Sequence, residues 1–573
     1  MISLSGNDGK HREDSARRGG SVGLSSTSVT PATAAGGHRA GRRPVRGGLA
    51  WAAGTVVVAV VLFAAYLLQS RTIPAGPDGA SIDLLSWDML HGNPLLRGWW
   101  VADVTFYTTE LPQYMLLESV RGLNAGLAHL GGAMTYTLLV LLAAFLARGR
   151  ARGAAGVVRA VTGGAIMLAP QLGDGTQTLM QGPDHTGTAV PVLALFILID
   201  CASPYGGQTA PHTPRGRRWW VPAVTALVLA WVLVGDALVI VIAAAPLAVV
   251  CLARACRGLV AREGLRAQWY ELSMAAAAIV SVPLGLAAIK LITALGGWQI
   301  GTLQTKLATT GILARNFRIT GQGLLELFGA DFIGAGSTRA VVFAVLHLAG
   351  VALVAWGVCA AVRGFLRGDP DRFIESVLLL AIVFDVAAYA FGVQVADLLS
   401  TREIAPVLPL GAALAGRLVG ERLAARRVAS AALAAGVACY AAMLAYGAAQ
   451  PAQAPVFEDL TAWLTAHHLS YGLSGYTQAN IVTVEGQGNI TLRPAGPAGP
   501  GGRFLGARKW EANRSWYDPA QHRATFVVAS TVGAAVVTRP EAIATFGQPA
   551  RTYHYHEYTI MVWNGNLLDR LRS

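Results

Sequence analysis

Charged residues are scarce in this sequence. Only 13% of its 573 residues are Asp, Glu, Lys or Arg, whereas hydrophobic residues make up 53%. Soluble globular domains carry roughly 25% charged residues. This deficit excludes a chain of several soluble domains. Apolar runs of about 20 residues recur along the sequence, and this length matches the roughly 30 Å hydrocarbon core of a bilayer. The composition therefore predicts an α-helical polytopic membrane protein.

Cysteine is also rare, and its placement excludes two kinds of chemistry. All five cysteines fall inside apolar runs or at their ends, and none forms a Cys-x-x-Cys pair. We therefore expect no disulfide in the outer segments and no metal or redox site built from cysteine. The sequence also has no Walker A loop, dinucleotide-binding glycine motif, His-Glu-x-x-His or nucleophile elbow. These absences argue against ATP-driven transport by this chain alone.

The net charge of +13 does not indicate a nucleic-acid partner, because its distribution fits a membrane protein. Residues 1–48 contribute +5, and most other arginines stand in short clusters between apolar runs. Such clusters are typical of cytoplasmic loops. They are Arg148/Arg150/Arg152, Arg215/Arg217/Arg218, Arg254/Arg257, Arg363/Arg367 and Arg422/Arg426/Arg427. The excess of 41 arginines over 4 lysines, with abundant Ala and Gly, is typical of a GC-rich bacterial genome.

Hydropathy predicts eleven membrane spans. They lie near 49–68, 126–146, 154–170, 186–202, 219–235, 237–254, 270–295, 338–361, 373–393, 403–420 and 428–448. With a cytoplasmic N-terminus, this odd number places every arginine cluster on the cytoplasmic side. We therefore expect a multi-pass protein of the bacterial plasma (inner) membrane, surrounded by membrane lipids.

Three regions follow from this topology. Residues 1–48 are predicted to form a disordered basic cytoplasmic tail. Residues 49–448 form the membrane domain, with outer loops at 69–125 and 296–337, and residues 449–573 form a small extracytoplasmic α/β or β-rich domain. Within this last domain we expect a helix at 457–469, a turn region at 494–502 and strands at 480–484, 489–493, 525–528, 534–538 and 551–563.

The first outer loop combines carboxylates with aromatic side chains. Its candidate catalytic acids are Asp78, Asp88, Asp103 and Glu110. The aromatic residues between and after them are Trp87, Trp99, Trp100, Phe106, Tyr107 and Tyr114. On a helix, Asp103 and Glu110 would lie about 20° apart around the axis. This pattern favours an acidic site beside a sugar-stacking surface, and the alternative is an interfacial loop without a site.

In these features the chain resembles the GT-C superfamily of membrane glycosyltransferases. The resemblance consists of many spans, an extracytoplasmic C-terminal domain and an acidic residue soon after the first span. Asp78, which precedes Met89-Leu-His-Gly92, best matches this acidic residue. A clear Asp-Glu or Asp-x-Asp motif is absent. The resemblance implies transfer of a sugar from a polyprenyl-phosphate donor to an envelope glycan, lipid or protein on the outer face.

Such a transfer needs a carboxylate base and cations for the departing phosphate. Asp78, Asp88 or Asp103 supplies the base, with Glu110 as a further acid. Candidates for substrate binding are His185 with its neighbour Asp184, Arg402 with its neighbour Glu403, and the loop residues Lys306, Arg315 and Arg318. The residues indicate neither a bound cofactor nor a metal site, and they leave a requirement for a divalent metal open.

Two other functions remain open at this point. Lys290 and Asp385 fall inside predicted spans, where ionisable residues are functional candidates. They could pair with each other in a purely structural role, and ionisable residues at this depth are also what a proton-coupled transporter shows, so they suit a transporter or flippase of lipid-linked sugars. The other alternative is a non-catalytic envelope assembly protein, for which the acids of the outer loops are dispensable. His185 and the Arg402–Glu403 pair also have purely structural interpretations at the ends of their spans.

Overall fold

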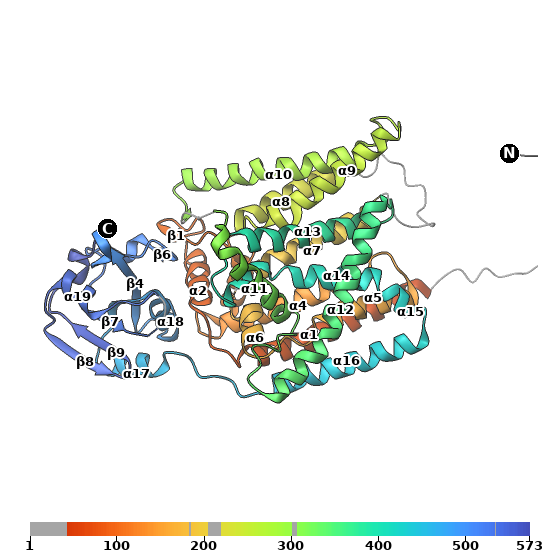
Figure 1. Ribbon diagram of the computed structural model, residues 1–573. Helices are drawn as coiled ribbons and strands as arrows, with labels where there is room; N and C mark the ends of the chain where they lie inside the picture. The colour runs from red at the N-terminus through yellow and green to blue at the C-terminus, as the bar shows by residue number, and fades with distance from the viewer. Residues whose placement is uncertain (1–42, 183–184, 204–218, 301–305, 533–534, 573) are drawn as a thin grey trace, which may run out of the picture. The chain divides into compact units, whose positions relative to one another are not determined.

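The computed structural model describes residues 43–182, 185–203, 219–300, 306–532 and 535–572 (Figure 1). The chain divides into two units, residues 1–55 and residues 56–573. Only the start of helix α1 is described in the first unit. The second unit contains the rest of α1 and all the other described elements.

Eight described helices are long and apolar enough to cross a membrane, and three shorter apolar helices occupy the other predicted positions. The predicted fold class is confirmed. The helices at these eleven positions are α1 (Arg43–Ser70), α4 (Leu127–Arg148), α5 (Gly153–Ile166), α7 (His185–Ala202), α8 (Trp220–Gly235), α9 (Ala245–Val260, after the π-helical turn η2, Ile240–Ala244), α10 (Trp269–Ala294), α12 (Thr338–Arg367), α13 (Phe373–Phe391), α14 (Val407–Leu418) and α16 (Arg427–Ala448).

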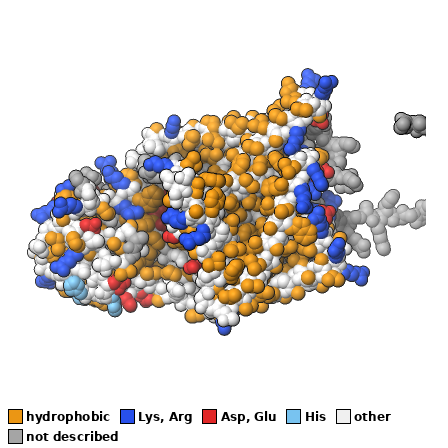
Figure 2. Space-filling view, viewed as in Figure 1, with side chains coloured by type: hydrophobic (Ala, Val, Ile, Leu, Met, Phe, Trp, Pro, Cys, Tyr) orange, Lys and Arg blue, Asp and Glu red, His pale blue; other side chains and the backbone are white. Residues whose placement is uncertain are grey.

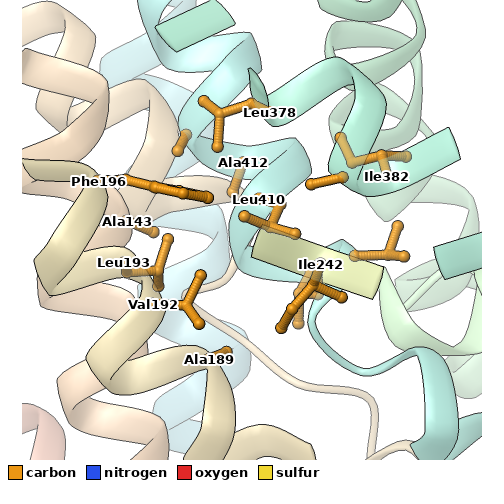
Figure 3. Packing of buried hydrophobic residues seen from close by; sticks show 14 of the residues in the cluster. Ala143, Ala189, Val192, Leu193, Phe196, Ile242, Leu378, Ile382, Leu410 and Ala412 are labelled. Carbon is orange, nitrogen blue, oxygen red and sulfur yellow. The ribbon is translucent and has the colours of Figure 1, made fainter. Parts of the chain in front are cut away.

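The interior of this helical region is a single apolar cluster. Figure 3 shows Leu193 and Phe196 of α7 packed near Leu378 of α13 and Leu410 of α14. The outer helices keep large apolar side chains exposed, and Figure 2 shows hydrophobic atoms covering most of the visible helical surface. Such an exposed apolar surface is stable against lipid tails rather than water.

Short elements lie at one end of the helical region. They are α2 (Pro77–Leu90), β1 (Trp99–Val101), α3 (Leu111–Arg121), α6 (Asp174–Met180), β2 (Gln299–Ile300), α11 (Thr310–Leu327) and the 3-10 helix η3 (Leu399–Ile404). The short helix α15 (Gly420–Ala424) joins α14 to α16. Strand β1 pairs with β2 and with β6 (Ala512–Asn513), so the first outer loop is hydrogen-bonded to the C-terminal region.

The C-terminal region is built on a six-stranded sheet in the order β5-β4-β3-β7-β9-β8. Its elements are α17 (Glu458–Ala466), β3 (Tyr471–Ser474), α18 (Tyr476–Glu485), β4 (Thr491–Ala498), β5 (Phe504–Ala507), β7 (Phe526–Ser530), α19 (Arg539–Phe546), β8 (Arg551–Tyr555) and β9 (Tyr558–Val562). Along β7, Phe526 and Val528 join the cluster shared with the outer loop, whereas Val527 and Ala529 face a second cluster. This alternation follows from the two-residue period of a strand.

Several predictions for the C-terminal region were wrong. Residues 480–484 belong to helix α18, because their apolar side chains pack on both α2 and the sheet. Residues 494–498 continue β4 despite two prolines, since Pro494 and Pro497 lie where the strand tolerates a missing N–H. The expected strand at 534–538 starts outside the described residues, and 535–538 form none. Residues 551–563 contain a hairpin rather than one strand.

A buried ion network joins four helices at the end of the helical region remote from the C-terminal sheet. Arg417 of α14 donates from Nη1 to Asp200 of α7 at 2.9 Å and from Nε to Glu375 of α13 at 2.8 Å. Its Nη1 also donates to the carbonyl oxygen of Leu146 in α4 at 2.9 Å. All three charged side chains are nearly inaccessible to solvent. Removing only the cation therefore leaves two carboxylates buried without it.

We predict that Arg417→Ala destabilises the fold by about 3–5 kcal/mol, the usual cost of leaving a buried charge unpaired. The measurement is thermal unfolding of the purified protein in detergent. Arg266→Ala is the matched control, because Arg266 is exposed on a loop. Equal midpoints for the two variants would contradict a structural role for the network.

Candidate functional site

Asp78 lies at the start of α2, in a position that the local sequence determines. Gly76 is extended, Pro77 takes the first helical position and Asp78 stands in the first turn, where a carboxylate interacts favourably with the helix dipole. A Cβ on Gly79 would lie 2.9 Å from the Cβ of Ala128, so glycine allows α2 to approach α4 closely. The carboxylate of Asp78 is consequently held at a fixed place beside the helical region.

Arg402 faces Asp78 from a distant part of the sequence. Its Nη1 donates to Asp78 Oδ2 at 2.8 Å, and both side chains are about one-third exposed. Arg402 belongs to η3, the short helix that precedes α14. The pair therefore joins the first outer loop to the end of a late span, and it remains accessible to a ligand.

The other oxygen of Asp78 is bound by the C-terminal region. The Tyr476 hydroxyl donates to Asp78 Oδ1 at 2.7 Å and also contacts the carboxyl of Glu511. A tyrosine hydroxyl has one hydrogen, so it cannot donate to two carboxylates. A protonated Glu511 supplies the missing hydrogen, because its carboxyl O–H donates to the Tyr476 hydroxyl oxygen. In agreement, burial and then the charge of Asp78 raise the pKa of Glu511 to about 8.

Glu511 is also held in an unusual backbone conformation. Its φ is +48°, in the left-handed region that few residues other than glycine adopt, and its side chain is 2% exposed. Such strain persists only where the surrounding structure enforces it, and it concentrates at functional sites. The pairing of β6 with β1 begins at the next residue, Ala512, and supplies part of this constraint.

His185 forms the second half of the cluster. Its Nδ1 lies 2.7 Å from Asp236 Oδ2 and its Nε2 lies 2.8 Å from Glu403 Oε2. A neutral imidazole has one N–H, so two carboxylate partners favour the doubly protonated ring. The Thr188 hydroxyl donates to Asp236 as well. Because Glu403 follows Arg402 in η3, His185 fixes the segment that carries Arg402.

Two more acids lie within electrostatic range of His185. Asp103 is half-buried, and its burial, followed by the nearby charge of Glu403, raises its pKa above the usual range. Asp385 of α13 is buried and interacts with His185, Asp236 and Glu403. The structure thus brings together five residues singled out in the sequence: Asp78, Asp103, His185, Arg402 and Glu403. Their roles stay predictions.

Comparison with solved structures finds a similar fold. The crystal structure of ArnT from Cupriavidus metallidurans bound to undecaprenyl phosphate matches with a TM-score of 0.52 at 13% identity, covering 89% of this chain and 98% of that chain. ArnT is a GT-C glycosyltransferase. The chain therefore has the GT-C fold.

Other matches are weaker. ArnT from the same organism in the apo state gives a TM-score of 0.41 at 14% identity, covering 92% of this chain and 100% of that chain. The apo oligosaccharyltransferase of Archaeoglobus fulgidus gives 0.43 at 12% identity, covering 83% and 69%. No family model matches the sequence, and neither does any curated protein.

The remaining candidates lie outside the cluster of this GT-C fold. Asp88 accepts from the Trp99 indole at 2.6 Å and from Asn93 at 2.7 Å, so its contacts hold the loop together. Glu110 is buried and packs so closely on α7 that a Cβ on Gly187 would overlap it. Asp184 lies outside the described residues. Asp103 and Glu110 do not share a helix, because residues 102–110 form turns.

The basic candidates of the second outer loop form no ion pair with Asp78 among the described contacts. Lys306, Arg315 and Arg318 are exposed, and Arg315 donates to the carbonyl oxygen of Val395 at 2.5 Å. The expected pairing of Lys290 with Asp385 was wrong. Lys290 is exposed on α10, whereas Asp385 is buried in α13 beside His185. The structural pairing of these two residues is therefore excluded, and the two side chains have separate surroundings.

Sequence analysis missed Tyr476 and Glu511, which join the candidate site from about 400 residues or more beyond Asp78. Neither residue stands in a motif or a periodic pattern. The only local indication at Glu511 is its backbone conformation, which is visible in the structure alone.

We predict that Glu511→Gln weakens the pH dependence of stability. The folded protein keeps the Glu511 proton up to a pKa of about 8, whereas the unfolded chain releases it near 4.5. The wild type therefore loses stability as pH rises from 4.5 to 8, and this contribution disappears in the variant. The measurement is the thermal midpoint in detergent at pH 5 and pH 8.

Glu557→Gln serves as the control, because Glu557 is an exposed glutamate in the hairpin turn between β8 and β9. The difference between the midpoints at pH 5 and pH 8 should shrink for Glu511→Gln and stay unchanged for Glu557→Gln. An unchanged difference in both variants would show that Glu511 is ionised at neutral pH.

Proposed function

We propose that this protein is a membrane glycosyltransferase. It moves a sugar from a polyprenyl-phosphate donor to a cell-envelope acceptor, a glycan, lipid or protein, on the outer face of the membrane. The observation that carries the proposal is the accessible Asp78–Arg402 pair, which joins a carboxylate base to a phosphate-binding cation within a GT-C fold. The similar ArnT structure was solved with undecaprenyl phosphate, which supports a lipid-linked donor.

In this proposal Asp78 is the general base. The hydroxyl oxygen of the acceptor attacks the anomeric carbon of the donor sugar, and a carboxylate oxygen of Asp78 takes the hydroxyl proton. The bond between the anomeric carbon and the phosphate oxygen breaks, and the polyprenyl phosphate leaves with the electron pair. Tyr476 holds the other Asp78 oxygen by a 2.7 Å hydrogen bond, so the carboxylate keeps one orientation during this step.

Arg402 binds the donor phosphate and stabilises its charge as it leaves. A guanidinium group has five N–H donors in a planar fork, enough to serve a carboxylate and a phosphate together. His185 has a different task, because both of its ring nitrogens already contact carboxylates. We assign it to positioning η3 through Glu403, and therefore to positioning Arg402.

The proposed location is the bacterial inner membrane, with the N-terminus in the cytoplasm and the C-terminal region outside. Arginines from two predicted cytoplasmic segments meet in the structure: Arg363, Arg367 and Arg372 from one segment and Arg422 from the other line one small cavity. In Figure 2, basic side chains gather at the end of the helical region away from the C-terminal region. This distribution supports the positive-inside orientation.

We predict that Asp78→Asn lowers sugar transfer by about 10²–10⁴-fold, the usual contribution of a positioned general base. Cells carrying the variant should accumulate the lipid-linked donor and lose one sugar linkage of the envelope, as a deletion does. The measurement compares envelope glycans and lipid-linked sugars at equal membrane expression. Asp459→Asn, an exposed substitution in α17, should behave as wild type.

Asp103→Asn is included to separate the two acids. A smaller loss than that of Asp78→Asn assigns the base to Asp78, and the reverse order moves it to Asp103. Normal glycans in both variants, with an altered glycan in the deletion, would favour the assembly role instead.

A second prediction concerns the phosphate. Arg402→Gln should weaken binding of undecaprenyl phosphate to the purified protein by roughly tenfold or more, since one charge-assisted contact is lost. Arg402→Lys should retain part of the affinity, because lysine keeps the charge without the planar fork. Arg551→Gln, an exposed change in β8, is the control. Equal affinity for all four proteins would remove Arg402 from the donor site.

A further inference from the structure

A cavity larger than the arginine-lined one lies next to the Asp78 cluster, which consists of Asp78, Arg402, Tyr476 and Glu511. It has a volume of about 1150 Å³ and lies between β1, the end of α10 and the C-terminal region. A typical small-molecule site measures roughly 300–1,000 Å³. This cleft is therefore large enough for a chain of several sugar units, and nothing in the proposed chemistry above uses it.

The charges that line the cleft are mainly positive. Arg97, Lys509, Arg514 and Arg572 line it, all four are exposed, and none forms an ion pair with a described carboxylate. Two of them have further contacts. The backbone N–H of Arg514 donates to the Gly98 carbonyl oxygen at 2.8 Å, and the Arg572 guanidinium lies 3.7 Å from the centre of the Phe504 ring.

The two acids of the cleft are already bound to neutral donors. Asp88 accepts from Trp99 and Asn93, and Asp518 accepts from the Gln521 side chain at 2.8 Å and the Ala520 N–H at 2.9 Å. The lining thus presents four cations and two engaged carboxylates. The four basic side chains therefore repel a cationic ligand and attract an anionic one.

Aromatic and amide side chains give the cleft a second property. The Trp100 and Tyr517 rings lie with centroids 6.4 Å apart and planes tilted by 41°, and Gln299, Asn513 and Ser515 add donors and acceptors. Flat aromatic surfaces with polar tips bind ligands that have both apolar faces and hydroxyl groups. Sugar rings have this character, whereas an inorganic anion gains nothing from the rings.

The cleft and the Asp78 cluster share one wall. Lys509 and Asn513 line the cleft, and the residue midway between them, Glu511, contacts Tyr476 on the other side. The carbonyl oxygen of Arg97 also accepts from Asn513 at 3.3 Å across the pairing of β1 with β6. Glu511 and Tyr476 therefore connect the wall of the cleft to the proposed base, Asp78.

We propose that this cleft binds an anionic oligosaccharide, whose sugars carry carboxylate or phosphate groups, and that this oligosaccharide is the acceptor. The binding site follows from the charges and rings of the cleft. Its assignment as the acceptor site rests on the proposed function.

The test measures binding to the full-length protein in lipid nanodiscs by calorimetry. The probes are hexagalacturonate, its fully methyl-esterified neutral form and a phosphorylated mannohexaose. The triple variant Arg97→Gln/Lys509→Gln/Arg514→Gln removes three cations of the cleft. The matched control is Arg503→Gln/Arg539→Gln/Arg551→Gln, which removes three exposed cations of the C-terminal region outside the cleft.

We expect wild type and the control triple to bind at least one anionic probe, and the cleft triple to bind it roughly tenfold or more weakly, from three partly screened charge contacts. The anionic probe that binds identifies carboxylate or phosphate as the recognised group. Equal binding of the neutral ester, equal binding by the cleft triple, or no binding of either anionic probe to wild type would overturn the proposal.

Asp78→Asn separates this proposal from the proposed function. Asp78 does not line the cleft, so the variant should bind the anionic probe as wild type does while it loses sugar transfer. Retained binding together with normal transfer in Asp78→Asn contradicts the proposed catalytic role of Asp78 and leaves the glycan site in place.

Discussion

The packing of α18 against α2 is the contact on which the candidate site depends. These helices are almost 400 residues apart in the sequence, yet Ile82 and Leu85 of α2 share one buried cluster with Ala479 and Val482 of α18. Burying such side chains contributes about 1.5–3 kcal/mol each for the larger ones. The same contact places the Tyr476 hydroxyl, at the start of α18, beside Asp78. An apolar interface therefore creates a polar site at its edge.

The membrane imposes the second constraint. Helices in a bilayer satisfy their own backbone hydrogen bonds, so irregular backbone is confined to the ends of the spans. The site residues follow this rule, because Asp78 begins α2, Asp236 follows α8, and Arg402 and Glu403 lie in η3 before α14. Their side chains converge because these helix ends lie at the same end of the helical region. The site residues are far apart in the sequence because each comes from the end of a different helix.

These two constraints explain which parts of the fold and of the candidate site could be predicted from the sequence. Apolar runs and arginine clusters are local signals, and they located the eight long and three shorter apolar helices of the described part of the chain. Asp78, His185 and Arg402 could be singled out as candidates, because charged residues beside spans are conspicuous, and their roles stay predictions. Tyr476 and Glu511 were not found, since only tertiary packing brings them to Asp78. The sequence predicts a strand at 480–484, within the helix Tyr476–Glu485, because buried faces on both α2 and the sheet remove the helical polar–apolar period.

The charge balance of the site limits what it can bind. Among the described residues, Asp236 and Glu403 contact His185, Asp385 lies within its electrostatic range, and Asp78 contacts Arg402. In the proposed transfer, Arg402 contacts the donor phosphate while its Nη1 holds Asp78, so a single guanidinium sets the distance between the proposed leaving group and the proposed base. A lysine has no planar fork to fix both partners, which is why this geometry requires arginine.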